Sequence, residues 1–165
     1  MKLFVDDVSV ICPAVASRDN MSSLLRSVEV KRFVRWMFLA LVLVCIDQMT
    51  KQLIIQTMGP LDFEEVLPFL AIVFTMNPGA AFSLLADASG WQRWFLSIIA
   101  IIAVALLLVM LFRNTADRLL SFGLVLILAG ALGNLIDRVM LGAVVDFILI
   151  YWRDFRWPVF NVADS

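Results

Sequence analysis

Three long apolar runs constrain the fold more than any other feature of this sequence. They extend from about Trp36 to Ile55, from Trp94 to Phe112 and from Leu119 to Ile136. A helix needs roughly 20 apolar residues to cross a bilayer, and each run comes close to that length. The second run carries no charge, whereas Asp47 and Lys51 interrupt the first. We therefore predict an all-α, multi-pass membrane protein with three transmembrane helices.

The positive residues near the ends of these runs predict their orientation. Seven lie before the first run or between the second and third, namely Arg18, Arg26, Lys31, Arg32, Arg35, Arg113 and Arg118. Four lie at the opposite ends, namely Arg93, Arg138, Arg153 and Arg156. Positive residues are enriched on the cytoplasmic side of a membrane. We therefore expect a cytoplasmic N-terminus, with the two longer loops, 56–90 and 137–165, on the outer side.

The two outer loops are expected to form a small extracytoplasmic region that contains strands. Three prolines in the first loop argue against a single long helix there. The segments that read as extended are Phe69–Met76, Val144–Tyr151 and Trp157–Phe160, with a turn at Asn77-Pro78-Gly79.

The chain before the first run reads differently from the rest. Met1–Ala16 faintly resembles a signal peptide, but Asp6 and Asp7 interrupt its apolar stretch. We predict a poorly ordered cytoplasmic extension over residues 1–33 and a membrane domain over residues 34–165. The first residue of the natural protein is either Met1 or Met21.

Composition excludes several kinds of chemistry. Of the 165 residues 62% are hydrophobic, none is a histidine, and the net charge is −1. Histidine metal sites, Ser-His-Asp triads and Cys-His pairs are therefore excluded, and nothing indicates a nucleic-acid partner. The two cysteines are far apart, which argues against a disulfide framework. Acid and base groups must come from Asp, Glu, Lys, Tyr or water, and we expect no metal or cofactor.

Charged residues at membrane depth are costly and are therefore functional candidates. Asp47 and Lys51 lie four residues apart, on one face of a helix. They either neutralise each other near the outer surface, with Lys51 snorkelling, or contact a substrate. Asp137 can form an interfacial ion pair with Arg138 or Arg153. Arg138 can alternatively bind a lipid head group or a substrate carbonyl.

Two further carboxylates, Asp146 and Asp164, each stand alone in an apolar segment near the outer surface. An isolated Asp is often only a helix cap or a solvated loop residue. Two carboxylates held close together, however, share one proton, so that one can act as a base and the other as an acid. Such a pair could hydrolyse a peptide without histidine, serine or metal.

Five short motifs occur in order along the chain. They are Asp47-Gln48-Met49-Thr50-Lys51, Asn77-Pro78-Gly79-Ala80-Ala81-Phe82, Gly130-Ala131-Leu132-Gly133-Asn134-Leu135-Ile136-Asp137-Arg138, Val144-Val145-Asp146-Phe147 and Phe160-Asn161-Val162-Ala163-Asp164-Ser165. Together they resemble the lipoprotein signal peptidase (signal peptidase II) family, over roughly Trp36 to Ser165.

The resemblance implies an aspartic endopeptidase of the bacterial inner membrane with its active site facing the periplasm. Its substrate would be a prolipoprotein that carries a diacylglyceryl group on a cysteine, and it would cut just before that cysteine. Other partners would be membrane lipids, and the protein would act as a monomer. By position, the catalytic residues are Asp146 and Asp164, the substrate-binding residues are Asn77, Gly79, Asn134, Arg138 and Asn161, and the supporting residues are Asp47, Lys51 and Asp137.

One difference from the family concerns the end of the chain. The family has four spans, and its second catalytic aspartate begins the fourth, whereas this sequence stops one residue past Asp164. We therefore expect either a fragment of a longer protein or a truncated, inactive membrane protein. The main alternative function is a small proton-linked transporter that uses Asp47, Asp137 and Asp146 as a relay. A second alternative is an inert membrane scaffold.

Overall fold

The computed structural model describes residues 13–60, 62–79 and 90–165, with side chains described for Ser23 and from Leu25 onward. Ala80-Ala81-Phe82 of the second motif and residues 1–12 therefore lie outside the described residues. The elements in chain order are α1 (Pro13–Thr57), β1 (Phe63–Leu67), β2 (Leu70–Asn77), α2 (Trp91–Arg113), α3 (Arg118–Met140), β3 (Val144–Trp152), β4 (Phe155–Arg156) and the 3-10 helix η2 (Val162–Asp164).

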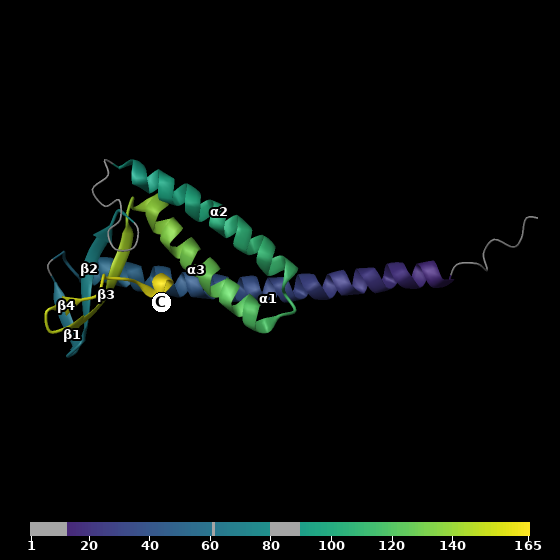
Figure 1. Ribbon diagram of the computed structural model, residues 1–165, viewed down its shortest axis with the longest axis horizontal. Coiled ribbons are helices and arrows are strands. Elements are labelled where there is room, and N and C mark those ends of the chain that lie inside the picture. Colours follow the sequence, from purple (N-terminus) through teal and green to yellow (C-terminus); the bar gives the residue numbers. More distant parts are fainter. Residues whose placement is uncertain (1–12, 61, 80–89) are drawn as a thin grey trace, which may run out of the picture.

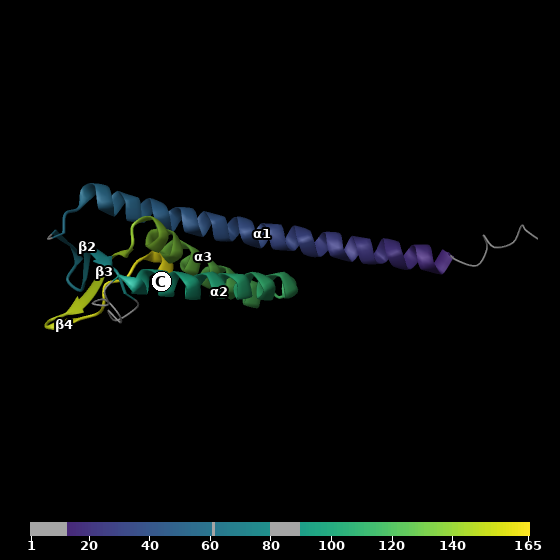
Figure 2. The same cartoon turned by 90° about the horizontal axis from the view of Figure 1, so that it is seen from above.

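The three predicted spans are confirmed as three helices long and apolar enough to cross a membrane. Helices α2 and α3 have 23 residues each, which corresponds to about 35 Å at 1.5 Å per residue. Helix α1 extends well beyond both of them (Figures 1 and 2). Its backbone is helical from Pro13, inside the stretch 1–33 that the sequence predicts to be poorly ordered.

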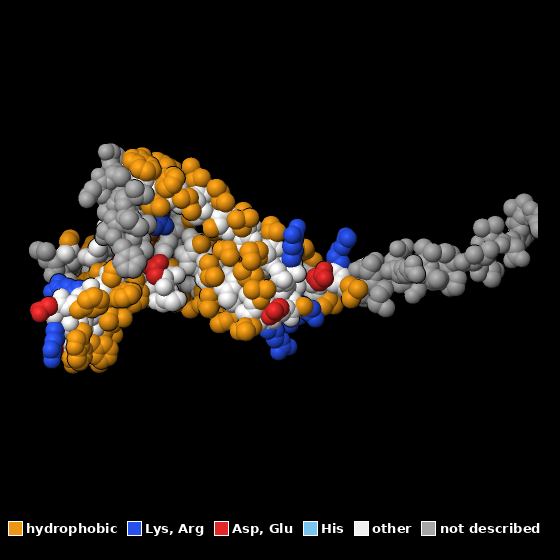
Figure 3. Space-filling model, viewed as in Figure 1, with side chains coloured by type: hydrophobic (Ala, Val, Ile, Leu, Met, Phe, Trp, Pro, Cys, Tyr) orange, Lys and Arg blue, Asp and Glu red, His pale blue; other side chains and the backbone are white. Residues whose placement is uncertain are grey.

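Helix α3 is the central element and packs against both α1 and α2 (Figure 1). Its N-terminus is capped by Asp117, whose carboxylate accepts from the backbone N–H of Leu120 at 3.0 Å. The buried core between the helices consists of Ala40, Leu111, Leu124, Val125 and Leu128. Apolar side chains also cover the outer surface of the helices (Figure 3). A helix that is apolar all round needs an apolar surrounding, which for these exposed faces is lipid.

A four-stranded antiparallel sheet in the order β1-β2-β3-β4 lies where α1 ends, α2 begins and α3 ends (Figure 1). Strands β2 and β3 confirm the predicted extended segments 69–76 and 144–151. Their register sets Thr75 opposite Asp146 and Asn77 opposite Val144. The pairing therefore brings the first outer loop to the catalytic candidate Asp146.

The sheet also differs from the sequence prediction. The predicted strand-containing region is larger than expected, because β1 and β4 were not predicted. Strand β1 is an edge strand with every residue exposed, so it lacks the alternation that would reveal it. The segment Trp157–Phe160, predicted to be extended, is not a continuous strand, but the N–H of Trp157 donates to Ile150 and Phe160 forms a bridge with Ile148. That bridge brings the following residues, 161–164, beside β3.

Two glycines allow α3 to be approached very closely. A Cβ atom on Gly130 would overlap the backbone carbonyl oxygen of Ala163, and one on Gly133 would overlap the carboxylate of Asp47. The absence of a side chain at these positions therefore lets η2 and α1 contact the same face of α3.

This close approach predicts different effects for two glycine substitutions in one helix. Gly130→Ala should lower the free energy of unfolding by about 1–3 kcal/mol, because η2 must shift to admit the methyl group. Gly123→Ala is the matched control, since a Cβ atom there has nothing within 4 Å. Thermal unfolding of both variants in one detergent measures the difference. Equal melting temperatures for the two variants would contradict the packing described.

Candidate active site

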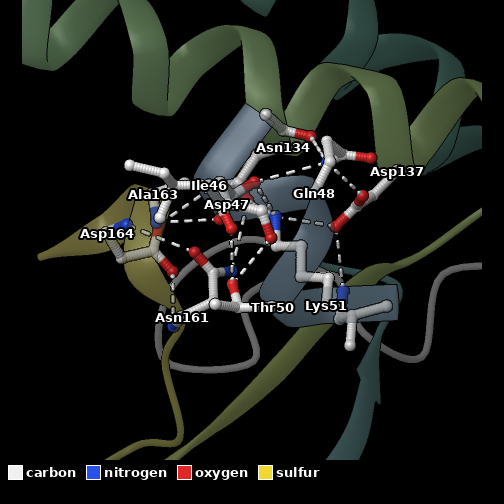
Figure 4. Close-up of polar contacts among 12 residues, drawn as sticks. Ile46, Asp47, Gln48, Thr50, Lys51, Asn134, Asp137, Asn161, Ala163 and Asp164 are labelled. Atoms are coloured by element: carbon white, nitrogen blue, oxygen red, sulfur yellow. Dashed lines mark hydrogen bonds and ion pairs between the residues drawn. The ribbon is translucent and has the colours of Figure 1, made fainter. Parts of the chain in front are cut away.

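A buried group of charged side chains joins α1 to α3 (Figure 4). The ammonium of Lys51 lies 2.9 Å from a carboxylate oxygen of Asp47 and 2.8 Å from one of Asp137. All three residues are at most 2% exposed. Charges so far from solvent are tolerated only when they are paired and hydrogen-bonded. The pairing therefore fixes how these two helices meet.

These contacts correct two expectations from the sequence. Asp137 pairs with Lys51 of α1, not with Arg138 or Arg153. Lys51 does pair with Asp47, but at 1% exposure it does not snorkel to the surface. The sequence analysis paired Asp137 with arginines nearer in sequence and placed Lys51 at the lipid surface. The two residues instead bind each other, although their helices are far apart in sequence.

Neighbouring groups satisfy the remaining oxygens of the two acids. Gln48 donates through Nε2 to Asp137 at 2.9 Å and to the carbonyl oxygen of Gly133 at 3.2 Å. The backbone N–H of Ala163 donates to Asp47 at 3.1 Å, and that of Val145 donates to Asp137 at 3.2 Å. The charged group thus also holds η2 and β3. Sequence reasoning gave Gln48 no role, although its spacing of three from Lys51 sets both on one helical face.

Asp146 lies on β3 and is 3% exposed. Asn77 donates to its Oδ2 at 3.0 Å and Asn161 donates to its Oδ1 at 2.7 Å. Burial raises the pKa of the Asp146 carboxyl above its usual value, and the charge of Asp164 raises this pKa as well. The two amide hydrogen bonds and the charge of Lys51 oppose that shift. Asp146 is therefore a carboxyl group that binds a proton more readily than an ordinary aspartate.

Asp164 lies at the end of η2, and its side chain is exposed. Its Oδ1 accepts from Nδ2 of Asn134 at 2.8 Å. Asn161 caps η2, and its side chain and that of Asp164 each accept from the other's backbone N–H. Asn161 therefore contacts both candidate catalytic residues (Figure 4 shows its side chain beside Asp164).

Arg138 and Gly79 complete the set of predicted site residues. Arg138 donates through Nη2 to the carbonyl oxygen of Gly79 at 3.2 Å, while the N–H of Gly79 donates to Asn77 at 3.0 Å. The charges of Asp164 and Asp146 act on the guanidinium, so it lies in the field of both. Its buried Nε has no hydrogen-bond partner among the described residues. The Nε–H donor of the guanidinium is therefore not used by the described residues.

The structure therefore brings all ten predicted residues into one connected region near the sheet end of the helices. In the described part of the chain, no group of three or more His, Cys, Asp or Glu could hold a metal ion. What the arrangement offers chemically is two interacting carboxyl groups in different environments, one buried and one exposed, held by amide side chains. Two carboxyl groups in different environments can differ in how readily each binds a proton.

Two lipoprotein signal peptidases are similar in sequence to this chain. A lipoprotein signal peptidase of Cupriavidus necator is 48% identical over 129 residues, which are 78% of this chain and 74% of the relative. One of Polynucleobacter necessarius is 44% identical over 131 residues, which are 79% of this chain and 80% of the relative.

Two solved structures of bacterial membrane enzymes share the fold. They are 40% and 41% identical to this chain, with TM-scores of 0.70 and 0.68. Each match covers 79% of this chain, and 79% and 83% of the solved chains. The family model for signal peptidase (SPase) II matches residues 39–165. The chain therefore belongs to the signal peptidase II family of membrane peptidases.

Proposed function

We propose that Asp146 and Asp164 form the catalytic dyad with which this chain removes signal peptides from prolipoproteins. Family membership gives the reaction class, which is peptide hydrolysis. The observation that carries the dyad is the pair of amide contacts that links the two carboxyl groups. Asn161 donates through its side-chain Nδ2 to the carboxyl group of Asp146 and through its backbone N–H to the carboxylate of Asp164.

The different surroundings of the two carboxyl groups suggest how they divide the work. In this proposal Asp146 is the proton donor, because burial raises its pKa. The exposed carboxylate of Asp164 takes a proton from a water molecule as the water oxygen bonds to the scissile carbonyl carbon. Asp146 gives its proton to the carbonyl oxygen. The tetrahedral gem-diol then collapses: one of its hydroxyl groups returns a proton to Asp146 as the C–N bond breaks, and Asp164 gives its proton to the leaving amine.

The polar residues around the dyad have two roles in this proposal. Asn77, Asn134 and Asn161 line the site and hold the two carboxyl groups by their amide N–H donors. Arg138 and the backbone of Gly79 bind the substrate backbone, since a guanidinium is suited to carbonyl oxygens in a site with little water. The supporting role belongs to the buried charged group of Asp47, Lys51 and Asp137, which holds η2 through Ala163 and binds Asn134.

The surroundings of the site suit a lipid-bearing substrate. It lies close to the boundary between the apolar helices and the sheet, where exposed Trp91 and Trp94 begin α2. Tryptophans gather at such boundaries in membrane proteins. We place this end at the periplasmic face of the bacterial inner membrane, with the N-terminus in the cytoplasm. There the enzyme, proposed to act as a monomer, cleaves before a diacylglyceryl-modified cysteine.

The transporter alternative gains no support. Asp47 and Asp137 pair with the same amine, and Asp146 lies nearby at the sheet end. A proton relay across the membrane needs carboxylates spread over its depth.

The dyad predicts the loss of cleavage when either carboxyl group is replaced. Asp146→Asn and Asp164→Asn should each lower kcat by about 10²–10⁴-fold, the usual contribution of a positioned acid or base. Asp154→Asn, at an exposed position after β3, is the matched control and should cleave normally. Cleavage of a lipid-modified prolipoprotein peptide by the full chain measures all three. Wild-type turnover by either dyad variant would rule out the assignment.

The raised pKa of Asp146 predicts a pH dependence. Activity should fall at high pH as Asp146 loses its proton. Asn77→Ala removes a hydrogen bond that favours the charged form, so it should raise this pKa further and move the alkaline limb of kcat/KM to higher pH. Asn114→Ala, at the far end of α2, should leave the limb in place. An alkaline limb that moves to lower pH in Asn77→Ala would contradict the proposal.

A further inference from the structure

The hydrogen bonds around Lys51 have a fixed direction. An ammonium group has three N–H donors and no acceptor. Two donors of Lys51 go to Asp47 and Asp137, and the third goes to Oδ1 of Asn134 at 3.0 Å. All three distances are at hydrogen-bond length, and the side chain is almost fully buried. Whatever group faces this third donor must therefore present an acceptor.

That requirement determines which way the Asn134 amide points. Its Oδ1 accepts from Lys51 and also from Nδ2 of Asn161 at 3.2 Å, which occupies both lone pairs of the oxygen. Its Nδ2 is then directed at Asp164, at 2.8 Å. Rotating the amide by half a turn would oppose an NH₂ group to two other donors. The amine of Lys51 thus selects the orientation in which Asp164 receives a donor.

The same logic extends to the other carboxyl group. Nδ2 of Asn161 has two hydrogens, and one goes to Asn134. The other goes to Oδ1 of Asp146 at 2.7 Å. Its own Oδ1 accepts from the backbone N–H of Asp164. Hydrogen bonds therefore connect the Lys51 ammonium to the amide of Asn134, and that amide to the amide of Asn161. Each amide supplies an N–H to one carboxyl group (Figure 4 shows Lys51, Asn134 and Asn161).

We propose that Lys51 is a positioning residue of the peptidase, which orients the Asn134 and Asn161 amides so that each presents a donor to the catalytic pair. This inference rests on the proposed dyad of Asp146 and Asp164. It gives Lys51 a task beyond neutralising Asp47 and Asp137. Without its amine, the Asn134 NH₂ group is drawn toward those two acids and away from Asp164.

The charged groups that act on Asp146 come from three elements. They are Lys51 of α1, Arg138 of α3 and Asp164 of η2. Removing the charge of Lys51 raises the pKa of Asp146 as well, so a pH shift alone would not separate charge from orientation. The test therefore needs a variant that loses the charge but keeps a donor.

Two substitutions of Lys51 provide that separation. Lys51→Met removes both the charge and the donor, and it should lower kcat roughly 10²-fold with little change in KM, as expected when reacting groups are misplaced. Lys51→Gln is also neutral but keeps an N–H for Asn134. It should recover kcat to at least about tenfold above Lys51→Met, although both variants lose the same charge. Equal kcat values for the two variants would mean that Lys51 acts only through its charge, which would overturn the proposal.

A second comparison tests the route through Asn134. In an Asn134→Ala background the amide that transmits the orientation is absent, so Lys51→Gln and Lys51→Met should no longer differ in kcat. Leu128→Ala, in the buried core between the helices, is the control for a loss of stability alone, because Leu128 lies outside the charged group and does not take part in the bond between Lys51 and Asn134. It should lower thermal stability while keeping kcat within about tenfold of wild type, well short of the loss in Lys51→Met.

The outcomes separate this proposal from the dyad itself. Cleavage of the prolipoprotein peptide by Asp146→Asn or Asp164→Asn would rule out the dyad, whatever the kcat values of the Lys51 variants. If both of these are inactive while Lys51→Met keeps wild-type kcat, only the positioning role fails. If Lys51→Met does not accumulate in membranes, the positioning role is tested by comparing kcat of Lys51→Gln with kcat of the double variant Lys51→Gln/Asn134→Ala. If the loss of kcat in the double variant equals the product of the two single losses, a route through Asn134 is contradicted. If the double variant loses no more kcat than Asn134→Ala alone, the route is supported.

Discussion

The amine of Lys51 binds Asp47 on its own helix and Asp137 on α3, in a space that solvent hardly reaches. Breaking a buried ion pair commonly costs about 3–5 kcal/mol, because the partner charge is left uncompensated. The three residues therefore have to meet whenever the helices are packed. From this contact, hydrogen bonds extend to η2 through Ala163, to β3 through Val145 and to the site through Asn134.

The two carboxyl groups reach this region by separate routes. Asp146 arrives on β3, which pairs with β2 and so also brings Asn77. Asp164 arrives on η2, which the bridge at Phe160 holds beside β3 and which lies against Gly130 of α3. Neither route alone forms a site. The difference in burial between the two acids follows from their positions, one on β3 within the sheet and one on η2, and in the proposed dyad this difference separates the acid from the base.

Some of this could be predicted from the sequence and some could not. The three spans and the strands β2 and β3 follow from apolar run length, prolines and turn residues. Strand β1 could not be found, because its residues are all exposed and show no alternation. The pairing of Lys51 with Asp137 depends on how two helices pack, which no local pattern encodes. The same holds for Gln48, whose partners lie on α1 and α3.

The two catalytic candidates could be predicted only in part. Asp146 and Asp164 stand out as lone carboxylates in apolar segments, but spacing alone does not bring them together. Only the ordered motifs suggested that they belong to one site. The amide orientations that join them were beyond sequence reasoning, because each depends on a donor contributed by another element.

Cleavage of substrate in H₂¹⁸O under single-turnover conditions tests most directly whether the two carboxyl groups act on water. Mass spectrometry of the released signal peptide, and of enzyme fragments that contain Asp146 and Asp164, reports where the label goes. Our account predicts one ¹⁸O atom in the new carboxylate of the signal peptide and none in either aspartate. Label in the side chain of Asp146 or Asp164 would contradict it, because that result requires a carboxylate to attack the peptide itself.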